Sequence, residues 1–365
     1  MTQKQQTQLK HVMMMAAGTG GHVFPALAVA KELQQNGVKV SWLATPSGME
    51  NRLLKNHDIP IYQIDIQGVR GNGLVRKLIA PFKILKATLS AMRYMKQLKV
   101  DAVAGFGGYV AGPGGLAARA LGIPVIIHEQ NAVAGFTNTQ LARIAKTVCQ
   151  AFPETFQDHA KVVTTGNPVR KEITEILNPS WRYQEREKQN LPLQILIVGG
   201  SLGAQALNER LPEALKQLNV PMQIYHQCGQ NHADATVARY GELPDHLQVN
   251  VQPFIEDMAL AYANADLIIC RAGALTVTEV ATAGVAAVFV PLPSAVDDHQ
   301  TANAKYLANA SAAKICPQST MAPENLQAVL SPLMNRQILS EMATKARQQA
   351  QPDATQHVVR LIQEL

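Results

Sequence analysis

The sequence is poor in charged and aromatic residues, which make up 16% and 5% of its 365 positions. Its four cysteines lie far apart, without Cys-X-X-Cys or Cys-X-X-His spacing, which argues against a disulfide framework or a zinc site. A reducing compartment fits this pattern. No uninterrupted apolar run approaches the ~18 residues of a membrane-spanning helix. A hydrophobic fraction of 47% nevertheless excludes intrinsic disorder.

The formal net charge of +6 permits a nucleic acid, an anionic lipid or a phosphate as partner without choosing among them. No basic stripe is interleaved with aromatic side chains that could stack on bases. We therefore expect no nucleic-acid partner.

The chain divides into two similar halves, and its length favours two domains over one. Residues 11–33 and 194–215 each predict an apolar strand, a glycine-rich turn and a helix. Further strands alternate with helical patterns in both halves, which predicts parallel sheets with right-handed crossovers. These strands are expected near 38–44, 102–105, 125–128, 147–151, 223–227, 247–251, 267–270 and 287–290.

The predicted fold class is α/β, with two doubly wound Rossmann-like domains that face each other across a cleft. We expect the domains to span residues 1–168 and 169–344, with a C-terminal helix, 345–365, that packs back on the first. The polar stretch 178–190 predicts a surface excursion.

Four glycine-rich turns follow predicted strands. Without Cβ atoms, such turns let backbone N–H groups approach an oxyanion, and a following helix adds the positive end of its dipole. Tight packing turns are the alternative explanation for each turn. The turns lie at 18–22, before a helix expected near Phe24–Pro25, and at 105–115, 199–203 and 271–279.

The fourth turn carries the sharpest chemical prediction. The N–H groups of Ala274, Leu275 and Thr276 would open a helix and could hold a diphosphate. Glu279 lies about one turn further along, where a carboxylate can accept hydrogen bonds from a ribose diol. A carboxylate that only caps the helix is the alternative.

Eight ordered runs resemble the MurG-type glycosyltransferase family of bacterial peptidoglycan synthesis. They are GTGGHVFPALAVA, GFGGYVAGPGG, HEQNAVAGFTN, GNPVR, GGSLGA, FIEDMA, CRAGALTVTE and DDHQTANA. The resemblance implies the GT-B fold and transfer of N-acetylglucosamine, with inversion, from UDP-GlcNAc to the C4 hydroxyl of MurNAc in undecaprenyl-diphosphate-MurNAc-pentapeptide. It also implies a peripheral location on the cytoplasmic face of the bacterial inner membrane. The resemblance is also compatible with other cell-wall synthesis proteins as partners.

The resemblance also assigns residues to substrates. The first domain becomes the acceptor and membrane side, and the second becomes the UDP-GlcNAc side. The implied UDP-GlcNAc contacts are Thr19, Gly20, Gly21, Asn131, Arg170, Ser201, Ile255, Ala274, Leu275, Thr276, Val277, Thr278, Glu279 and Gln300. Ala17 and Thr301 depart from the family pattern, where a glycine and a second glutamine are common.

Inversion needs a base for the acceptor hydroxyl and stabilisation of the leaving diphosphate. His22, directly after the first glycine turn, is the leading candidate base, and Glu129 is the alternative. His22 could instead only hydrogen-bond the turn. The sequence has no Asp-X-Asp motif, so we expect no protein-bound metal and no cofactor, with helix N-termini and Arg170 stabilising the leaving group.

Residues 69–99 are basic and amphipathic and contain no acidic residue. Such a segment can rest in the headgroup layer of an anionic membrane, where a lipid-linked acceptor resides. A core helix with a solvated basic face is the alternative. The expected membrane contacts are Arg76, Lys77, Ile79, Phe82 and Lys83.

Rival functions use the same architecture. A GT-B transferase with another acceptor, a UDP-GlcNAc epimerase and a nucleotide-sensing protein without turnover remain alternatives, and the HEQN, GNPVR and DDHQ runs disfavour the first two.

Overall fold

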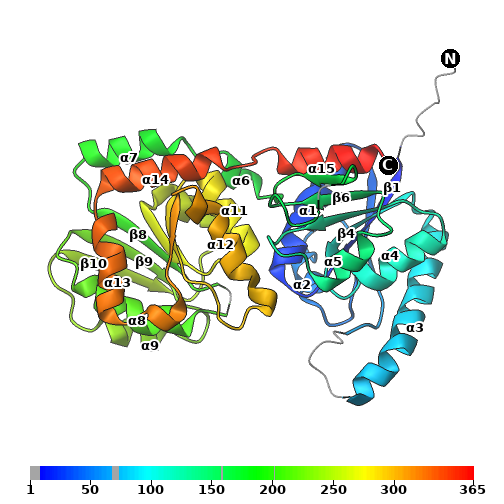
Figure 1. Ribbon diagram of the computed structural model, residues 1–365, viewed down its shortest axis with the longest axis horizontal. Helices are drawn as coiled ribbons and strands as arrows, with labels where there is room; N and C mark the ends of the chain where they lie inside the picture. The colour runs from blue at the N-terminus through cyan, green and yellow to red at the C-terminus, as the bar shows by residue number, and fades with distance from the viewer. Residues whose placement is uncertain (1–8, 68–73, 158, 201) are drawn as a thin grey trace. The chain divides into compact units, whose positions relative to one another are not determined.

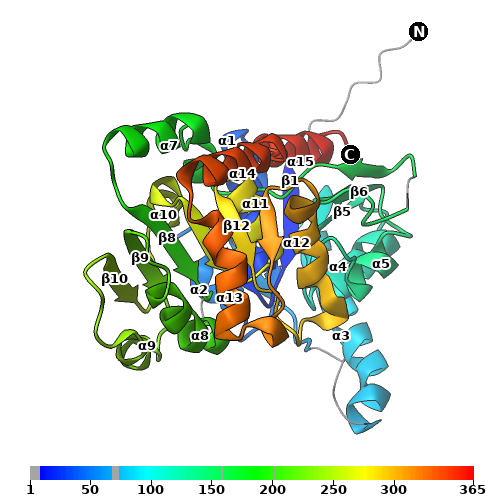
Figure 2. The same ribbon diagram turned by 60° about the vertical axis from the view of Figure 1, so that its left-hand side comes forward.

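The computed structural model describes residues 9–67, 74–157, 159–200 and 202–365, except for the side chains of 74–78 and of Val296. The chain forms two compact units. One comprises Met1–Val169 and Gln351–Leu365, and the other comprises Arg170–Ala350. Figure 1 and Figure 2 show that each unit is built on a sheet with helices on both faces.

The first unit contains a seven-stranded parallel sheet in the order β3-β2-β1-β4-β5-β6-β7. Its strands are β1 His11–Ala16, β2 Lys39–Ala44, β3 Ile61–Gln63, β4 Ala102–Gly107, β5 Val125–Glu129, β6 Thr147–Gln150 and β7 Val162–Thr164. Its helices are α1 Gly20–Gln35, α2 Met49–Leu53, α3 Leu74–Leu98, α4 Ala111–Ala120, α5 Phe136–Leu141 and α15 Ala354–Gln363.

The second unit contains a six-stranded parallel sheet in the order β10-β9-β8-β11-β12-β13. Its strands are β8 Leu193–Val198, β9 Met222–Gln227, β10 Leu247–Gln252, β11 Leu267–Cys270, β12 Ala286–Phe289 and β13 Ala313–Ile315. Its α-helices are α6 Lys171–Thr174, α7 Pro179–Lys188, α8 Gln205–Lys216, α9 Ala233–Tyr240, α10 Met258–Asn264, α11 Ala274–Ala283, α12 His299–Asn309, α13 Pro323–Leu330 and α14 Arg336–Gln348.

Strand β1 shows why the first sheet is covered on both faces. Successive side chains of a strand point to opposite faces, and here both sets are apolar. Val12 and Met14 join the core beneath α1 and α15, whereas Met13 and Met15 join the core beneath α3 and α4. With both faces covered by helices, the carboxyl ends of the strands are lined by the connecting turns. Ligands bind at this end of such sheets.

The final segment divides between the units. Helix α14 continues to Gln348 and packs on α7 and β12 of the second unit, so residues 345–350 belong there. Helix α15 packs on α1 and places Val358, Val359 and Ile362 in the first unit's core. The helical pattern expected to run on to the C-terminus is interrupted near Pro352, which cannot continue a helix ladder.

The stretch 178–190, expected to be a surface excursion, is largely exposed but forms a helix with three buried residues. These residues form α7, which begins with Asn178 accepting a hydrogen bond from the N–H of Ser180. Arg182 is buried and donates to the carbonyl oxygens of Tyr262, Ala263, Ala283 and Gly284. Arg182 can be buried here because its guanidinium satisfies backbone carbonyls at helix ends.

Candidate functional site

The start of α11 is a candidate anion site in the second unit. Strand β11 ends at Cys270, Gly273 adopts the extended N-cap conformation, and the helix opens at Ala274, as the sequence predicted. The first intrahelical bond recorded at this end runs from the N–H of Val277 to the carbonyl of Gly273. The N–H groups of Ala274, Leu275 and Thr276 therefore project beyond the helix start, where they suit a diphosphate.

Glu279 lies on the same helix and is held by two side chains. Its Oε1 accepts from Nη2 of Arg170 at 3.0 Å, and its Oε2 accepts from the hydroxyl of buried Tyr262 at 3.0 Å. Burial raises the pKa of Glu279, and Arg170 and Tyr262 oppose that rise. Both oxygens are bonded to side chains, which is not the arrangement of a helix cap.

Gln300 secures the turn before α11. Its Oε1 accepts from the N–H groups of Ala272 at 3.2 Å and Leu292 at 2.9 Å, so the amide nitrogen is the end left to meet a ligand. Asn303, one turn along α12, donates to the carbonyl of Ala272. The adjacent Thr301 donates to Asp298 at 2.7 Å. Helix α12 thus fixes the turn that carries the first N–H groups of α11.

Ile255 follows β10 and the second glycine turn follows β8, the two strands on either side of β9. Ile255 is buried in the segment between β10 and α10. Ser201 lies outside the described residues. The N–H of Gly200 donates to Oε1 of Gln227 at 3.0 Å, and a Cβ at Gly203 would come within 2.1 Å of a backbone oxygen. Close packing therefore explains Gly203, whereas a positive φ of 87° with open space around it favours glycine at position 200. Helix α8 begins only at Gln205.

In the first unit, the first glycine turn leads directly into a helix. Helix α1 begins at Gly20, so the expected start near Phe24–Pro25 is wrong, and His22 lies in the first turn. Thr19 Oγ1 and His22 Nδ1 are 3.3 Å apart. A Cβ at Gly107 would lie 2.8 Å from the His22 ring, so glycine at position 107 makes room for the imidazole.

The glycines at 105–115 serve packing more than ligand binding. A Cβ at Gly108 would lie 2.1 Å from the carbonyl oxygen of Ala17, and one at Gly114 would lie 2.3 Å from Met15 Sδ. They let α4 and its turn approach β1 closely. The sequence-based interpretation that four turns exceed the needs of packing is wrong for this cluster.

Glu129 and Asn131 form a second group in the first unit. Glu129 accepts from the backbone N–H of Asn131 at 3.0 Å, from that residue's amide at 3.2 Å, from the N–H of Gly135 at 3.1 Å and from Asn138 at 2.8 Å. Nearby His128 is buried, and burial lowers its pKa to about 4. Glu129 therefore holds the 131–138 loop in place.

Sequence reasoning missed a buried carboxylate beside the first glycine turn. Glu50 accepts from the N–H and the hydroxyl of Thr45, both at 2.9 Å, and from the N–H of Gly18 at 3.3 Å. It sits under a cavity of about 330 Å³. The only available signal was a glycine two residues before an acid, Gly48-Met49-Glu50.

Comparison with known proteins identifies the family. Residues 12–150 match the glycosyltransferase family 28 N-terminal domain, and residues 194–358 match the family's C-terminal domain. A protein of Acinetobacter baylyi is 78% identical over all of both chains, and it is named UDP-N-acetylglucosamine–N-acetylmuramyl-(pentapeptide) pyrophosphoryl-undecaprenol N-acetylglucosamine transferase. The chain belongs to the MurG-type transferases of glycosyltransferase family 28.

Solved structures agree with this family. The crystal structure of Acinetobacter baumannii MurG matches at a TM-score of 0.87 and 75% identity, covering 98% of this chain and 100% of that one. A glycosyltransferase of kitacinnamycin shares the fold at a TM-score of 0.72 with only 16% identity, covering 98% and 99% of the two chains. The predicted GT-B fold is confirmed.

Helix α3 of this MurG-type transferase exposes apolar side chains. Phe82 is 75% exposed, Leu85 and Leu89 are each 57% exposed, and Ile79 is 46% exposed. Lys83 is exposed beside them, whereas the side chains of Arg76 and Lys77 lie outside the described residues. In both views the N-terminal half of α3 extends away from α4 and the sheet of its unit (Figure 1; Figure 2). None of the helices in the described part of the chain is both long and apolar enough to cross a bilayer.

Proposed function

We propose that this chain transfers N-acetylglucosamine from UDP-GlcNAc to the C4 hydroxyl of MurNAc in undecaprenyl-diphosphate-MurNAc-pentapeptide, with inversion at the anomeric carbon. The observation that carries the proposal is the start of α11. The N–H groups of its first turn project beyond the helix, and the Glu279 carboxylate lies about one turn further along. That pairing suits a nucleoside diphosphate, and the name of the 78% identical relative specifies the sugar and the acceptor.

The donor binds the second unit in this proposal. The diphosphate accepts hydrogen bonds from the N–H groups of 274–276. The ribose diol donates to the Glu279 carboxylate in place of Arg170, whose guanidinium turns to the phosphates. The backbone of Ile255 meets the uracil, and the amide nitrogen of Gln300 meets GlcNAc hydroxyls. Ser201 and Asn131, with Val277 and Thr278 of α11, complete the donor contacts carried over from the family.

The acceptor binds the first unit with His22 as general base, and the turn of Thr19, Gly20 and Gly21 keeps the UDP-GlcNAc contact that the family resemblance implies. His22 takes the proton as the C4 oxygen bonds to the anomeric carbon and the bond to UDP breaks. Glu129 is the weaker candidate because four loop hydrogen bonds already engage its two oxygens. The leaving diphosphate is stabilised by the α11 N–H groups and Arg170 without a metal held by the protein. UDP release abolished by EDTA would contradict this last point.

The exposed side chains of α3 dock the protein on an anionic membrane. Phe82 and Leu85 enter the acyl boundary while Lys83 meets headgroups, an arrangement suited to an acceptor whose polyprenyl tail stays in the bilayer. The protein therefore works as a peripheral protein on the cytoplasmic face of the inner membrane.

The deciding experiment supplies UDP-GlcNAc with the lipid-linked MurNAc-pentapeptide acceptor and scores UDP and disaccharide product. We expect both in equal amounts, with a β linkage by NMR. UDP without disaccharide would indicate another acceptor, an epimerised sugar would indicate an epimerase, and binding without UDP release would indicate a nucleotide sensor.

A further inference from the structure

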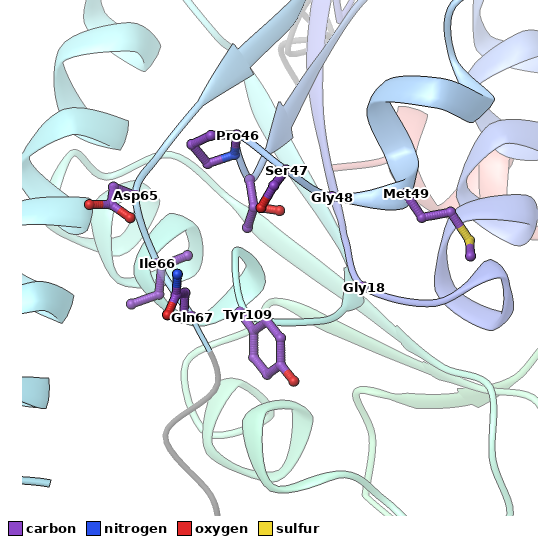
Figure 3. Close-up of a pocket in the computed structure, with 10 residues that line it drawn as sticks. Gly18, Pro46, Ser47, Gly48, Met49, Asp65, Ile66, Gln67 and Tyr109 are labelled. Atoms are coloured by element: carbon purple, nitrogen blue, oxygen red, sulfur yellow. The ribbon is translucent and has the colours of Figure 1, made fainter. Parts of the chain in front are cut away.

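A polar cavity lies beside the first glycine turn, within the first unit. It has a volume of about 330 Å³ and opens among the turns that follow β1, β2, β3 and β4. Figure 3 shows Asp65, Ile66 and Gln67 along one side, with Gly18 and Met49 on the other.

The cavity is built before any ligand arrives. Glu50 lies fully buried beneath it and ties Thr45, on the β2 turn, to Gly18, on the β1 turn. Asn51 donates to the carbonyls of Thr45 at 2.8 Å and Gly48 at 3.1 Å. A Cβ at Gly48 would lie only 2.0 Å from the Glu50 carboxylate, so glycine is needed there for the carboxylate to fold under the turn.

The described part of the lining does not suit a phosphate ligand. The described residues that surround the cavity include no lysine, arginine or histidine, and they include the exposed carboxylate Asp65. The nearest turn N–H, that of Gly18, already donates to Glu50. The groups that line the cavity and could contact a ligand are the Asp65 carboxylate, the Gln67 amide and the Ser47 hydroxyl. Met49 and Tyr109 add apolar surface. Amide N–H groups and small apolar side chains fit this mixture.

The cavity and the candidate base share their supporting turns. Gly18 lines the cavity and directly precedes Thr19, which contacts His22. Tyr109 lines it from the turn whose Gly107 packs on the His22 ring. In a muramyl sugar the peptide is attached through a lactyl group at O3, next to the C4 hydroxyl, whereas the diphosphate is attached at C1 across the ring.

We infer that this cavity holds the lactyl-linked beginning of the acceptor's peptide, with Asp65 and Gln67 bonding its amides. The inference rests on the proposed function. It makes the cavity a subsite for the peptide and places the lipid diphosphate elsewhere. The donor, in the second unit, is untouched by it.

A thiol-protection experiment tests the occupant directly. All four native cysteines are buried, so Ser47→Cys adds one exposed thiol at the cavity. Maleimide labelling is followed with a short-prenyl acceptor carrying the pentapeptide and with the same compound lacking the peptide. At a concentration ~10 times its Kd, the peptide acceptor should slow labelling of the introduced thiol about ten-fold. The peptide-free compound should not slow it. Asp58→Cys, exposed in the same unit but outside the lining, is the control.

Kinetics supply an independent measurement. Asp65→Asn should lower kcat/KM for the pentapeptide acceptor by about ten-fold and leave the Kd of UDP-GlcNAc unchanged. Asp58→Asn should change neither. Equal protection by both acceptors, or no protection of Ser47→Cys while the wild-type chain forms product, would overturn the inference. Absence of product with the wild-type chain would instead count against the proposed function.

Discussion

Three carboxylates illustrate how partners decide what an acidic residue can do. Glu50 and Glu129 bond mainly to loop N–H and amide groups, so exchanging their partners would undo local structure. Glu279 bonds to the side chains of Arg170 and Tyr262, which can move without breaking a backbone bond. Of these three, Glu279 is best able to accept a new ligand.

His22 provides the first prediction. His22→Ala should lower turnover at least ~100-fold, because general base catalysis typically contributes 10²–10⁴-fold, while the Kd of UDP-GlcNAc stays nearly unchanged. Steady-state kinetics and calorimetric titration measure the two quantities. His159→Ala, an exposed histidine of the same unit, should behave like the wild type. Normal turnover in His22→Ala would remove this residue from the mechanism.

Glu279 provides a prediction about pH. The ionised carboxylate accepts from both ribose hydroxyls, so donor affinity should be full above its raised pKa and fall as pH drops through it. Because burial holds that pKa above the ordinary value of a glutamate, affinity should begin to fall at a higher pH than it would with an exposed glutamate. Glu279→Gln should bind UDP about ten-fold or more weakly and lose this pH dependence.

Titration of UDP affinity from mildly alkaline pH downward measures the effect. Glu256→Gln, an exposed glutamate of the same unit, serves as the control. Equal pH profiles for the wild type and Glu279→Gln would rule out the ribose role.

The residues that sequence reasoning found and missed differ in a physical way. Glu279 was predictable because a glycine, a helix start and an acid follow one another along the chain. Tyr262 and Glu50 owe their positions to contacts made across the fold or beneath a turn, which no periodic pattern encodes. Arg182 was missed because polarity normally indicates exposure.

Among the elements, the longer strands were predicted and the short edge strands were not. Strands β3, β7 and β13 have three residues each, too few for an alternation pattern to emerge. Helix α7 shows a different kind of error. Its charged sequence predicts exposure, although Arg182 and Tyr183 on this helix are buried. Hydrogen bonds from Arg182 to the ends of α10 and α11 override the local pattern there.

Helix α7 gives a stability prediction. Arg182→Met should destabilise the second unit by about 3 kcal/mol, because it leaves buried carbonyls without their donor. Chemical denaturation measures the change. Arg210→Met, an exposed arginine of the same unit, should change the free energy of unfolding little. A near-wild-type midpoint for Arg182→Met would show that the guanidinium bonds add no net stability.

Helix α3 gives a membrane prediction. Reversing the charges of Arg76, Lys77 and Lys83, or changing Phe82 and Leu85 to serine, should weaken binding to anionic vesicles about ten-fold or more. The Kd of UDP-GlcNAc should stay the same. Vesicle sedimentation measures binding, with Lys96→Glu near the other end of α3 as the control. Undiminished vesicle binding would favour the alternative of a core helix with a solvated basic face.

At the scale of the whole molecule, the last helix completes the first unit. Ending the chain after Ala350 removes three buried side chains from the core beneath α1. At roughly 1.5–3 kcal/mol for each buried side chain, the first unit should lose more than about 4 kcal/mol of stability. The second unit should unfold as before.

The two tryptophans allow the units to be followed separately. Trp42 lies in the core of the first unit, and Trp181 lies on α7 of the second. With Trp181 changed to Phe, the fluorescence of Trp42 reports the first unit alone. Arg360→Ala, exposed on α15, is the matched control. Unchanged Trp42 unfolding in the shortened chain would contradict the prediction.

Because residues 351–365 return to the first unit, a fluorophore pair attached at Lys10 and Leu365 would sit on a single body. Energy transfer between these labels would report whether the first unit is intact. It would not change when the two units move relative to each other. A sensor of donor-induced motion therefore needs one label inside 170–350. With every native thiol buried, an introduced surface cysteine there would be labelled selectively.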